Sequence, residues 1–160
     1  VDDRVALQLA DAAAEAAASF PVRPYVARGV ARLNAAPAAG AVGDDEWQAL
    51  GPRCLACTGC SNLCPTCTCF TVVDEPGEAG GTRVRLWDSC LLEGFQREAS
   101  GHHPAPRAGD RVRRFWYHKL SRDFAGPTGG LGCVGCGRCD VACPGTIGAL
   151  GVLAALGGER

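Results

Sequence analysis

The first part of the chain is patterned as helix. Alanine dominates from Ala6 to Ala18, and the acidic residues near the start are suited to a helix N-terminus. Pro21 and Pro24 then interrupt the run, because proline cannot donate a backbone hydrogen bond. Residues 1–34 are therefore predicted to form one or two helices.

Small residues without periodicity follow, over residues 35–43, and predict a linker. Acidic residues then stand where a helix begins, and Trp47 and Leu50 give that short helix one apolar side. This change of pattern divides the chain into an alanine-rich helical extension with a linker, residues 1–43, and a second unit, residues 44–160.

A change to a period of two predicts a β-hairpin in the middle of the chain. Phe70–Val73 and Thr82–Trp87 are β-prone, and apolar residues alternate with arginines in the second segment. Proline and several glycines lie between them, which predicts a loop longer than the tightest hairpin turns.

The remaining periodic segments are helical. Leu91–Ala99 and Asp110–Phe124 are predicted helices, and Ile147–Leu156 is a predicted closing helix that its glycines weaken. The fold class is accordingly α+β and mostly helical. A helical two-cluster ferredoxin core with an inserted hairpin is the first expectation, and a compact β-α-β ferredoxin core is the second.

Composition indicates that packing alone does not hold this chain together. Only 6% of its 160 residues are aromatic and 22 are glycine, so the side-chain core must be thin. The 11 cysteines are the remaining source of stability, as disulfides, as zinc ligands or as iron-sulfur ligands.

Charge and hydropathy exclude several classes. A formal net charge of −1 argues against binding to nucleic acid, which needs a basic excess. It also favours a fixed subunit over a freely diffusing, strongly acidic carrier. No segment is long and apolar enough for a membrane span, and charges interrupt the N-terminal region where an export signal would lie, so we expect a cytoplasmic protein.

The strongest feature is an internal repeat of the run C-x2-C-x2-C-x3-C-P, which is typical of bacterial ferredoxins and predicts two 4Fe-4S clusters. Its ligand positions are Cys54, Cys57, Cys60 and Cys64 in the first run, and Cys133, Cys136, Cys139 and Cys143 in the second.

The fourth cysteine of such a run ligates the other cluster in two-cluster ferredoxins, so we expect crossed ligation. One cluster is then held by Cys54, Cys57, Cys60 and Cys143, and the other by Cys133, Cys136, Cys139 and Cys64. The apolar residues that we expect to shield the clusters from water are Leu55, Leu63, Val134, Val141 and Ala142.

Two other cysteine chemistries fit less well. Structural zinc uses pairs of C-x2-C and needs neither the third cysteine nor the C-P of each run. Closely spaced cysteines without an export signal do not resemble a secreted disulfide framework.

Three cysteines remain, Cys67, Cys69 and Cys90, and we expect buried thiols near the first cluster. The alternative is a further metal centre that they form with His102, His103 or His118. We expect these histidines instead to be solvent-exposed, hydrogen-bonded to backbone or in contact with a partner. Trp47, Trp87 and Trp116 are expected to anchor the core.

A basic stretch runs from Arg107 to Arg122. The simple interpretation is a solvated helix face, and the alternative is a docking surface for an acidic partner subunit.

The order of motifs between Asp44 and Pro144 resembles a known family. The motifs are CLACTGCSNLCPTCTCF, RLWDSC, ASGHHP, RRFWYHK and GCVGCGRCDVACP. They resemble the two-cluster iron-sulfur β subunit of sulfhydrogenase-type, NAD(P)-linked nickel-iron hydrogenases. They are also similar to the iron-sulfur, electron-transferring subunit of anaerobic sulfite reductase. His103 departs from this pattern, since the family has Asn there, and the region before the first run is short and alanine-rich.

The resemblance implies an electron-transfer subunit between a flavin subunit that handles NAD(P)H and the hydrogenase. Such a chain makes or breaks no substrate bonds by itself. An electron-transfer subunit of anaerobic sulfite reductase is the closest alternative. A redox-sensing or structural iron-sulfur protein is an alternative of another class.

Overall fold

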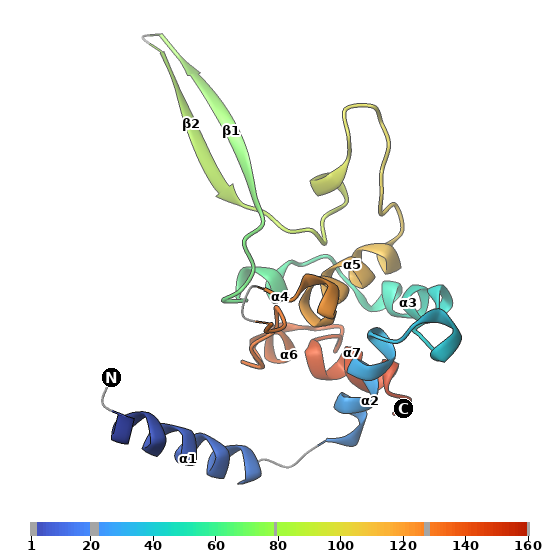
Figure 1. Ribbon diagram of the computed structural model, residues 1–160. Helices are drawn as coiled ribbons and strands as arrows, with labels where there is room; N and C mark the ends of the chain where they lie inside the picture. Colours follow the sequence, from blue (N-terminus) through green and yellow to red (C-terminus); the bar gives the residue numbers. More distant parts are fainter. Residues whose placement is uncertain (1–2, 20–22, 79, 127–128, 160) are drawn as a thin grey trace.

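The computed structural model describes residues 3–19, 23–78, 80–126 and 129–159 and is mostly helical (Figure 1). Its α-helices are α1 (Asp3–Ser19), α2 (Pro24–Leu33), α3 (Asp44–Leu50), α4 (Gly59–Asn62), α5 (Ala108–Leu120), α6 (Arg138–Ala142) and α7 (Ala149–Leu156). Short 3₁₀ turns are η1 (Pro37–Ala39), η2 (Gly51–Arg53), η3 (Glu93–Gln96) and η4 (Arg122–Phe124), and the strands are β1 (Phe70–Gly77) and β2 (Gly80–Trp87).

Helix α5 lies at the centre of the core. Its buried apolar side chains recur at spacings of three and four residues, which places them on one helix face. That face packs on α3, and α2 packs on α7. The buried apolar side chains form one cluster: Leu33, Trp47, Leu50, Cys67, Cys90, Leu91, Val112, Phe115, Trp116, Leu120, Ile147, Val152, Leu153 and Leu156.

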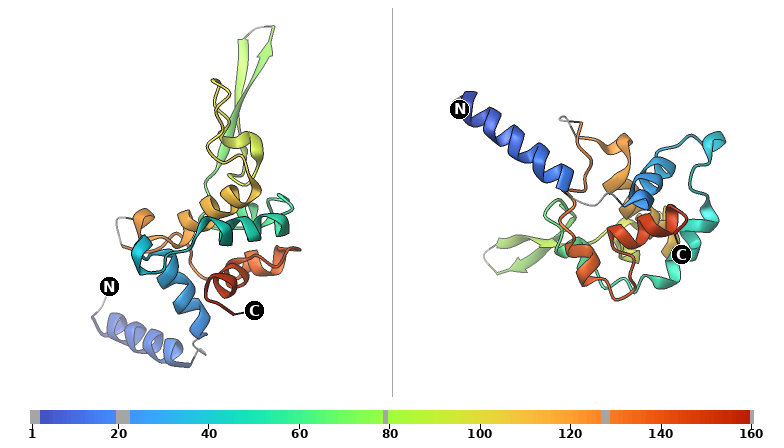
Figure 2. Two further views of the ribbon diagram at one scale, coloured as in Figure 1. Left: turned by 90° about the vertical axis from the view of Figure 1, so that its right-hand side faces the viewer. Right: turned by 90° about the horizontal axis from the view of Figure 1, so that it is seen from below.

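Helices α2 and α7 lie side by side in both views of Figure 2 and approach closely at Gly29. A Cβ at Gly29 would lie only 2.6 Å from the Leu153 carbonyl oxygen. Arg32 of α2 also forms a two-pronged ion pair with Glu46 of α3, with both N–O distances at 2.8 Å. Residues of the predicted extension thus contact the core, and the division of the chain after residue 43 stays a prediction.

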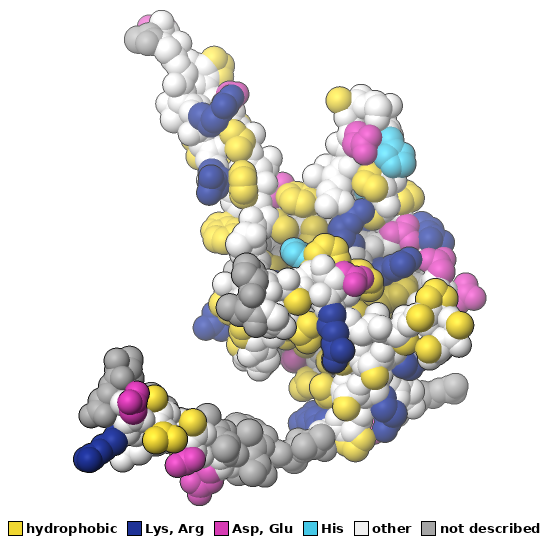
Figure 3. Space-filling model, viewed as in Figure 1, with side chains coloured by type: hydrophobic (Ala, Val, Ile, Leu, Met, Phe, Trp, Pro, Cys, Tyr) yellow, Lys and Arg dark blue, Asp and Glu magenta, His cyan; other side chains and the backbone are white. Residues whose placement is uncertain are grey.

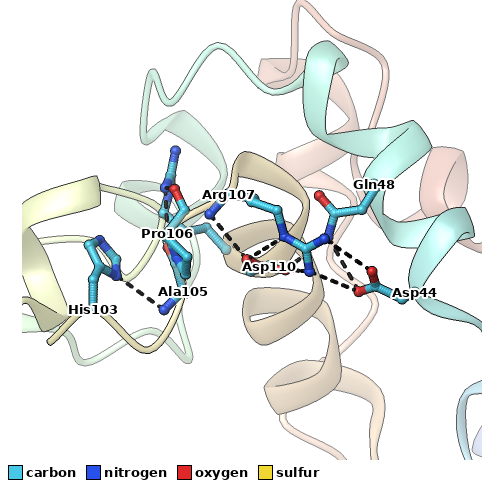
Figure 4. A network of polar contacts seen from close by, with 8 residues as sticks. Asp44, Gln48, His103, Ala105, Pro106, Arg107 and Asp110 are labelled. Carbon is cyan, nitrogen blue, oxygen red and sulfur yellow. Dashed lines mark hydrogen bonds and ion pairs between the residues drawn. The ribbon is translucent and has the colours of Figure 1, made fainter.

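A polar network joins α3 to the start of α5 (Figure 4). The Arg107 guanidinium donates to Asp110 at 2.8 Å and to Asp44 at 3.1 Å, and Gln48 donates to Asp110 at 2.8 Å. The hydrogen bond from Arg107 is the main cause that holds the pKa of Asp110 below its usual value. The network fixes where α5 begins and hence the position of the core helix.

The hairpin projects from the helices with both faces exposed (Figures 1 and 3). Its pairing continues to Gly77↔Gly80, so the loop is shorter than the sequence predicted. An ion pair between Asp74 and Arg83 supports the extra pairing, and the open edge of a two-stranded sheet tolerates Pro76.

Most predicted elements are confirmed: two helices before residue 34, the α3 helix with buried Trp47 and Leu50, one hairpin, and the long helix α5. In the described part of the chain β1 and β2 are the only strands, so the β-α-β alternative is wrong.

Two predictions about this middle region are wrong. Instead of a helix over Leu91–Ala99 there is only η3, because Leu92 and Arg97 on either side are extended and Gly94 disfavours a helix. Trp87, expected in the core, has 73% of its surface exposed because no helix covers the hairpin.

The close approach at Gly29 predicts that Gly29→Leu forces α2 away from α7. Overpacking of this kind costs about 1–3 kcal/mol, which exceeds the helix propensity gained by removing a glycine. Urea unfolding of the cluster-containing protein, followed by circular dichroism, measures the loss. The matched control is Ala27→Leu, at an exposed position of the same helix. Equal midpoints for the two variants would show that α2 does not support the fold.

Candidate iron-sulfur centre

Both cysteine runs adopt the same local conformation, 79 positions apart. Positive φ values occur at Ala56 (50°) and Thr58 (62°) in the first run, and at the equivalent Gly135 (68°) and Gly137 (71°) in the second. This left-handed conformation costs an alanine or threonine roughly 1–2 kcal/mol but a glycine almost nothing. A strained conformation kept in both runs indicates that the loop shape serves the thiols it carries.

Each loop leads into a short helix, α4 or α6, and these two helices pack against each other. A Cβ at Gly59 would lie 3.7 Å from the Ala142 side chain, so the small residues allow the runs to meet. This contact brings together two parts of the chain that are far apart in sequence.

The first run forms a pocket with the end of the second run. Its cysteines are Cys54, Cys57, Cys60 and Cys143. Its apolar wall comes from three other parts of the chain: Leu91, Val112, Trp116 and Ile147.

The second run forms a neighbouring pocket with the end of the first run. The cysteines that line it are Cys133, Cys136, Cys139 and Cys64, together with Cys60. Cys60 and Trp116 line both pockets, so the two pockets share a wall. The ligand assignment and its crossing stay a prediction, which the paired cysteine variants below address.

Backbone N–H groups near the start of α7 point at sulfur atoms of the second run. Ile147 donates to the Cys143 sulfur and Ala149 to the Cys139 sulfur, both at 3.4 Å. Such N–H bonds stabilise negative charge on sulfur and are one of the ways in which proteins set cluster potentials. The donor set therefore fits an anionic iron-sulfur cluster.

Crowding of the thiols makes them hard to ionise without metal. Burial is the main cause that raises the pKa of Cys60 to about 12, and the neighbouring Cys143, Cys54 and Cys57 raise it further in the same direction. Iron needs the thiolate form, so assembly of the clusters must displace protons from these groups. The cost of gathering the thiols is thus offset only when metal binds.

No three His, Cys, Asp or Glu side chains among the described residues lie close enough together to hold a single metal ion. A cubane differs because its irons occupy separate corners, so its thiolates stand further apart than those of a mononuclear site. The two pockets, each lined by cysteines from both runs, suit this wider arrangement.

The predicted apolar shell is largely wrong. Val141 is 91% exposed and Leu63 is 51% exposed, and neither lines a pocket. Leu55 and Val134 line the pockets from exposed positions. The apolar wall instead comes mostly from α5 and the segments packed on it, which lie far from the cysteine runs in sequence and which local sequence therefore could not reveal.

The three additional cysteines lie next to one another. Cys67 and Cys90 are buried, as predicted, and Cys69 is half-buried. Burial is the main cause that raises the pKa of Cys67 to about 11 and that of Cys90 to about 12. The Cys67 and Cys90 thiols are therefore protonated and poorly reactive at neutral pH.

The histidines have the ordinary roles expected of them. His102 and His118 are exposed, and His118 packs edge-on against Phe124. The Nδ1 atom of His103 accepts a hydrogen bond from the Ala105 backbone N–H at 3.1 Å (Figure 4).

The basic stretch is not a uniformly solvated face. Arg113 and Arg122 are exposed, whereas Lys119 is only 5% exposed and lines the second pocket. Lys119 was missed by the sequence analysis, although its spacing from Val112 and Phe115 places it on the buried face of α5. Docking of an acidic partner to the exposed arginines stays a prediction.

Residues 53–147, more than half of the chain, match the family described as 4Fe-4S dicluster domain. The chain therefore belongs to the 4Fe-4S dicluster domain family and binds two 4Fe-4S clusters. It is a ferredoxin-type protein, for which the chemistry implied is electron transfer.

Among known proteins it is similar to sulfhydrogenase 2 subunit beta of Pyrococcus furiosus. The two are 39% identical over 102 residues, which is 63% of this chain and 30% of that protein. The chain thus spans less than a third of its relative's length. No solved structure matches the chain. None of the helices within the described ranges has the length and apolar character to cross a membrane.

The left-handed loop positions predict a cost for Gly135→Ala. A Cβ there would meet no atom within 4 Å, so the loss of about 1–2 kcal/mol is purely conformational. Urea unfolding of the cluster-containing protein, followed by visible absorbance, measures it. Gly126→Ala is the control, since its Cβ is equally free and its φ is not positive. Equal effects of both variants would contradict the strain argument.

The crossed assignment predicts different outcomes for two double variants. Cys54→Ala with Cys143→Ala removes two ligands from one cluster, so one cluster's iron and sulfide remain. Cys54→Ala with Cys64→Ala removes one ligand from each cluster, so both are weakened. Iron and acid-labile sulfide analysis after anaerobic isolation distinguishes the two. The reverse pattern would show that each run ligates its own cluster.

Proposed function

We propose that the chain relays single electrons between a flavin subunit that handles NAD(P)H and a nickel-iron hydrogenase. The residues that would hold the first cluster are Cys54, Cys57, Cys60 and Cys143, and those for the second are Cys133, Cys136, Cys139 and Cys64. A 4Fe-4S cluster supplies a one-electron redox centre that needs no acid, base or nucleophile from the protein.

The observation that carries this proposal is the wall that the two pockets share. Cys60 and Trp116 line both, so redox centres in them would lie in adjacent sites of one rigid core. A chain with a storage or purely structural cluster has no need of a second centre beside the first. Adjacent centres instead suit the passage of electrons through the molecule.

The chain's own residues contribute position, dryness and hydrogen bonds. Trp116 is 3% exposed and Val112 is 1% exposed, and both keep water from the inner side of the pockets. Ile147 and Ala149 donate their backbone N–H groups to ligand sulfurs. A rigid, apolar and hydrogen-bonded surround keeps the reorganisation small when the charge changes.

The relative's name supports the choice of partner, because that protein is a subunit of a sulfhydrogenase. An electron-transfer subunit of anaerobic sulfite reductase is the nearest alternative, on the strength of the shared motif order. A redox-sensing or structural iron-sulfur protein would use the same ligands without passing electrons on.

The proposal predicts that anaerobically isolated chain contains two clusters' worth of iron and acid-labile sulfide. On reduction, its EPR spectrum should show magnetic coupling between the two centres, because they occupy adjacent pockets. Zinc without inorganic sulfide would contradict the proposal at its base. Intact clusters that accept no electron from a low-potential donor would favour the structural alternative.

The partner is identified by what co-purifies from the native source. A nickel-containing subunit together with a flavoprotein supports the hydrogenase assignment. A sirohaem protein instead would redirect the proposal to sulfite reduction, with the electron-transfer role unchanged.

A further inference from the structure

Lys119 is a buried cation beside the second pocket. Only 5% of its surface is exposed, and no carboxylate forms an ion pair with it among the residues that the structure describes. Burying an ammonium group without an anion is costly, and proteins keep such a charge only where something repays the cost. A cluster ligated by four thiolates is itself net anionic and would provide the missing counter-charge.

The contacts of Lys119 direct its charge toward one ligand. Its Nζ donates to the Thr66 carbonyl at 2.9 Å and to the Thr66 hydroxyl at 2.8 Å. That hydroxyl lies 3.3 Å from the Cys64 sulfur and donates to the Gly132 carbonyl at 2.6 Å. A single hydroxyl group thus separates the ammonium from a ligand sulfur, next to the loop that begins the second run.

The other charges around the two pockets are weaker or opposed. Arg138 lines the second pocket but is exposed, and Asp140 lines it with a half-buried carboxylate that accepts from the Leu150 N–H at 2.9 Å. The first pocket is lined by exposed Arg53, whose guanidinium donates to Gly145 and Thr146. Lys119 is the buried cation of the pair of sites, because solvent screens the exposed arginines much more strongly.

We propose that Lys119 is a positioning residue that raises the reduction potential of the cluster held by Cys64, Cys133, Cys136 and Cys139, and so makes the two clusters unequal. Reduction adds one negative charge to that cluster, and a fixed ammonium nearby stabilises the reduced form more than the oxidised form. This inference rests on the proposed function, since it requires clusters in both pockets.

The test is an EPR-monitored redox titration of cluster-containing protein with dithionite as the reductant. Lys119→Gln keeps a hydrogen-bond donor for Thr66 and removes the charge, so one cluster should become about tenfold harder to reduce, equivalent to about 59 mV for one electron. The potential of the other cluster should change far less, because the interaction falls with distance. Lys119→Arg keeps the charge and should restore the wild-type value.

Two variants at the same pocket complete the comparison. Arg138→Gln removes an exposed charge and should shift the potential little, whereas Asp140→Asn removes an opposing charge and should raise it. The double variant Cys54→Ala with Cys143→Ala leaves the second-pocket cluster alone and identifies which potential has moved.

A purely structural role for Lys119 makes a different prediction. Lys119→Gln would then lower stability or cluster content while the potentials stayed unchanged, and that result would overturn the inference. Equal shifts of both clusters would overturn it as well. Failure of the wild-type chain to bind two clusters would instead remove the proposed function, and iron and sulfide analysis distinguishes this from failure of the inference.

Discussion

The convergence of two distant cysteine runs on two adjacent pockets is the constraint on which the rest of this structure depends. The runs are 79 residues apart, and each contributes its last cysteine to the pocket of the other. Loop closure over such a distance costs entropy, and burial makes the gathered thiols harder to ionise. Binding of iron to the thiolates supplies free energy that this thin apolar core does not provide by itself.

The helices serve this convergence. α5 presents one apolar face that forms the common wall of the pockets, and α3 and α7 hold α5 and the second run in place. The polar network at Arg107 sets the start of α5, and the N–H groups near α7 reach the ligand sulfurs. A cofactor site of this kind is built mostly from backbone and apolar side chains, because electron transfer needs position and dryness more than reactive groups.

The hairpin and α1 contribute little to this core. Both faces of the hairpin are exposed, including the large apolar side chains Phe70, Val72, Leu86 and Trp87. Cross-strand contacts hold the strands together: the Asp74–Arg83 ion pair and Arg85 lying 4.3 Å above the Phe70 ring. A two-stranded hairpin is marginal in water by itself, so its anchorage beside the first cysteine run is what keeps it ordered.

The sequence by itself determined the chemistry of this protein and the identity of most of its elements. The repeated cysteine spacing predicts two 4Fe-4S clusters because the ligands of each loop are local, and local spacing is visible in sequence. The helix periods and the alternation of the hairpin are local as well, and they predicted α2, α3 and α5 correctly. Only the tertiary structure decided what surrounds the pockets. Trp87 and Val141 are exposed and Lys119 is buried, because burial depends on which distant segment covers a residue, and no local pattern encodes that.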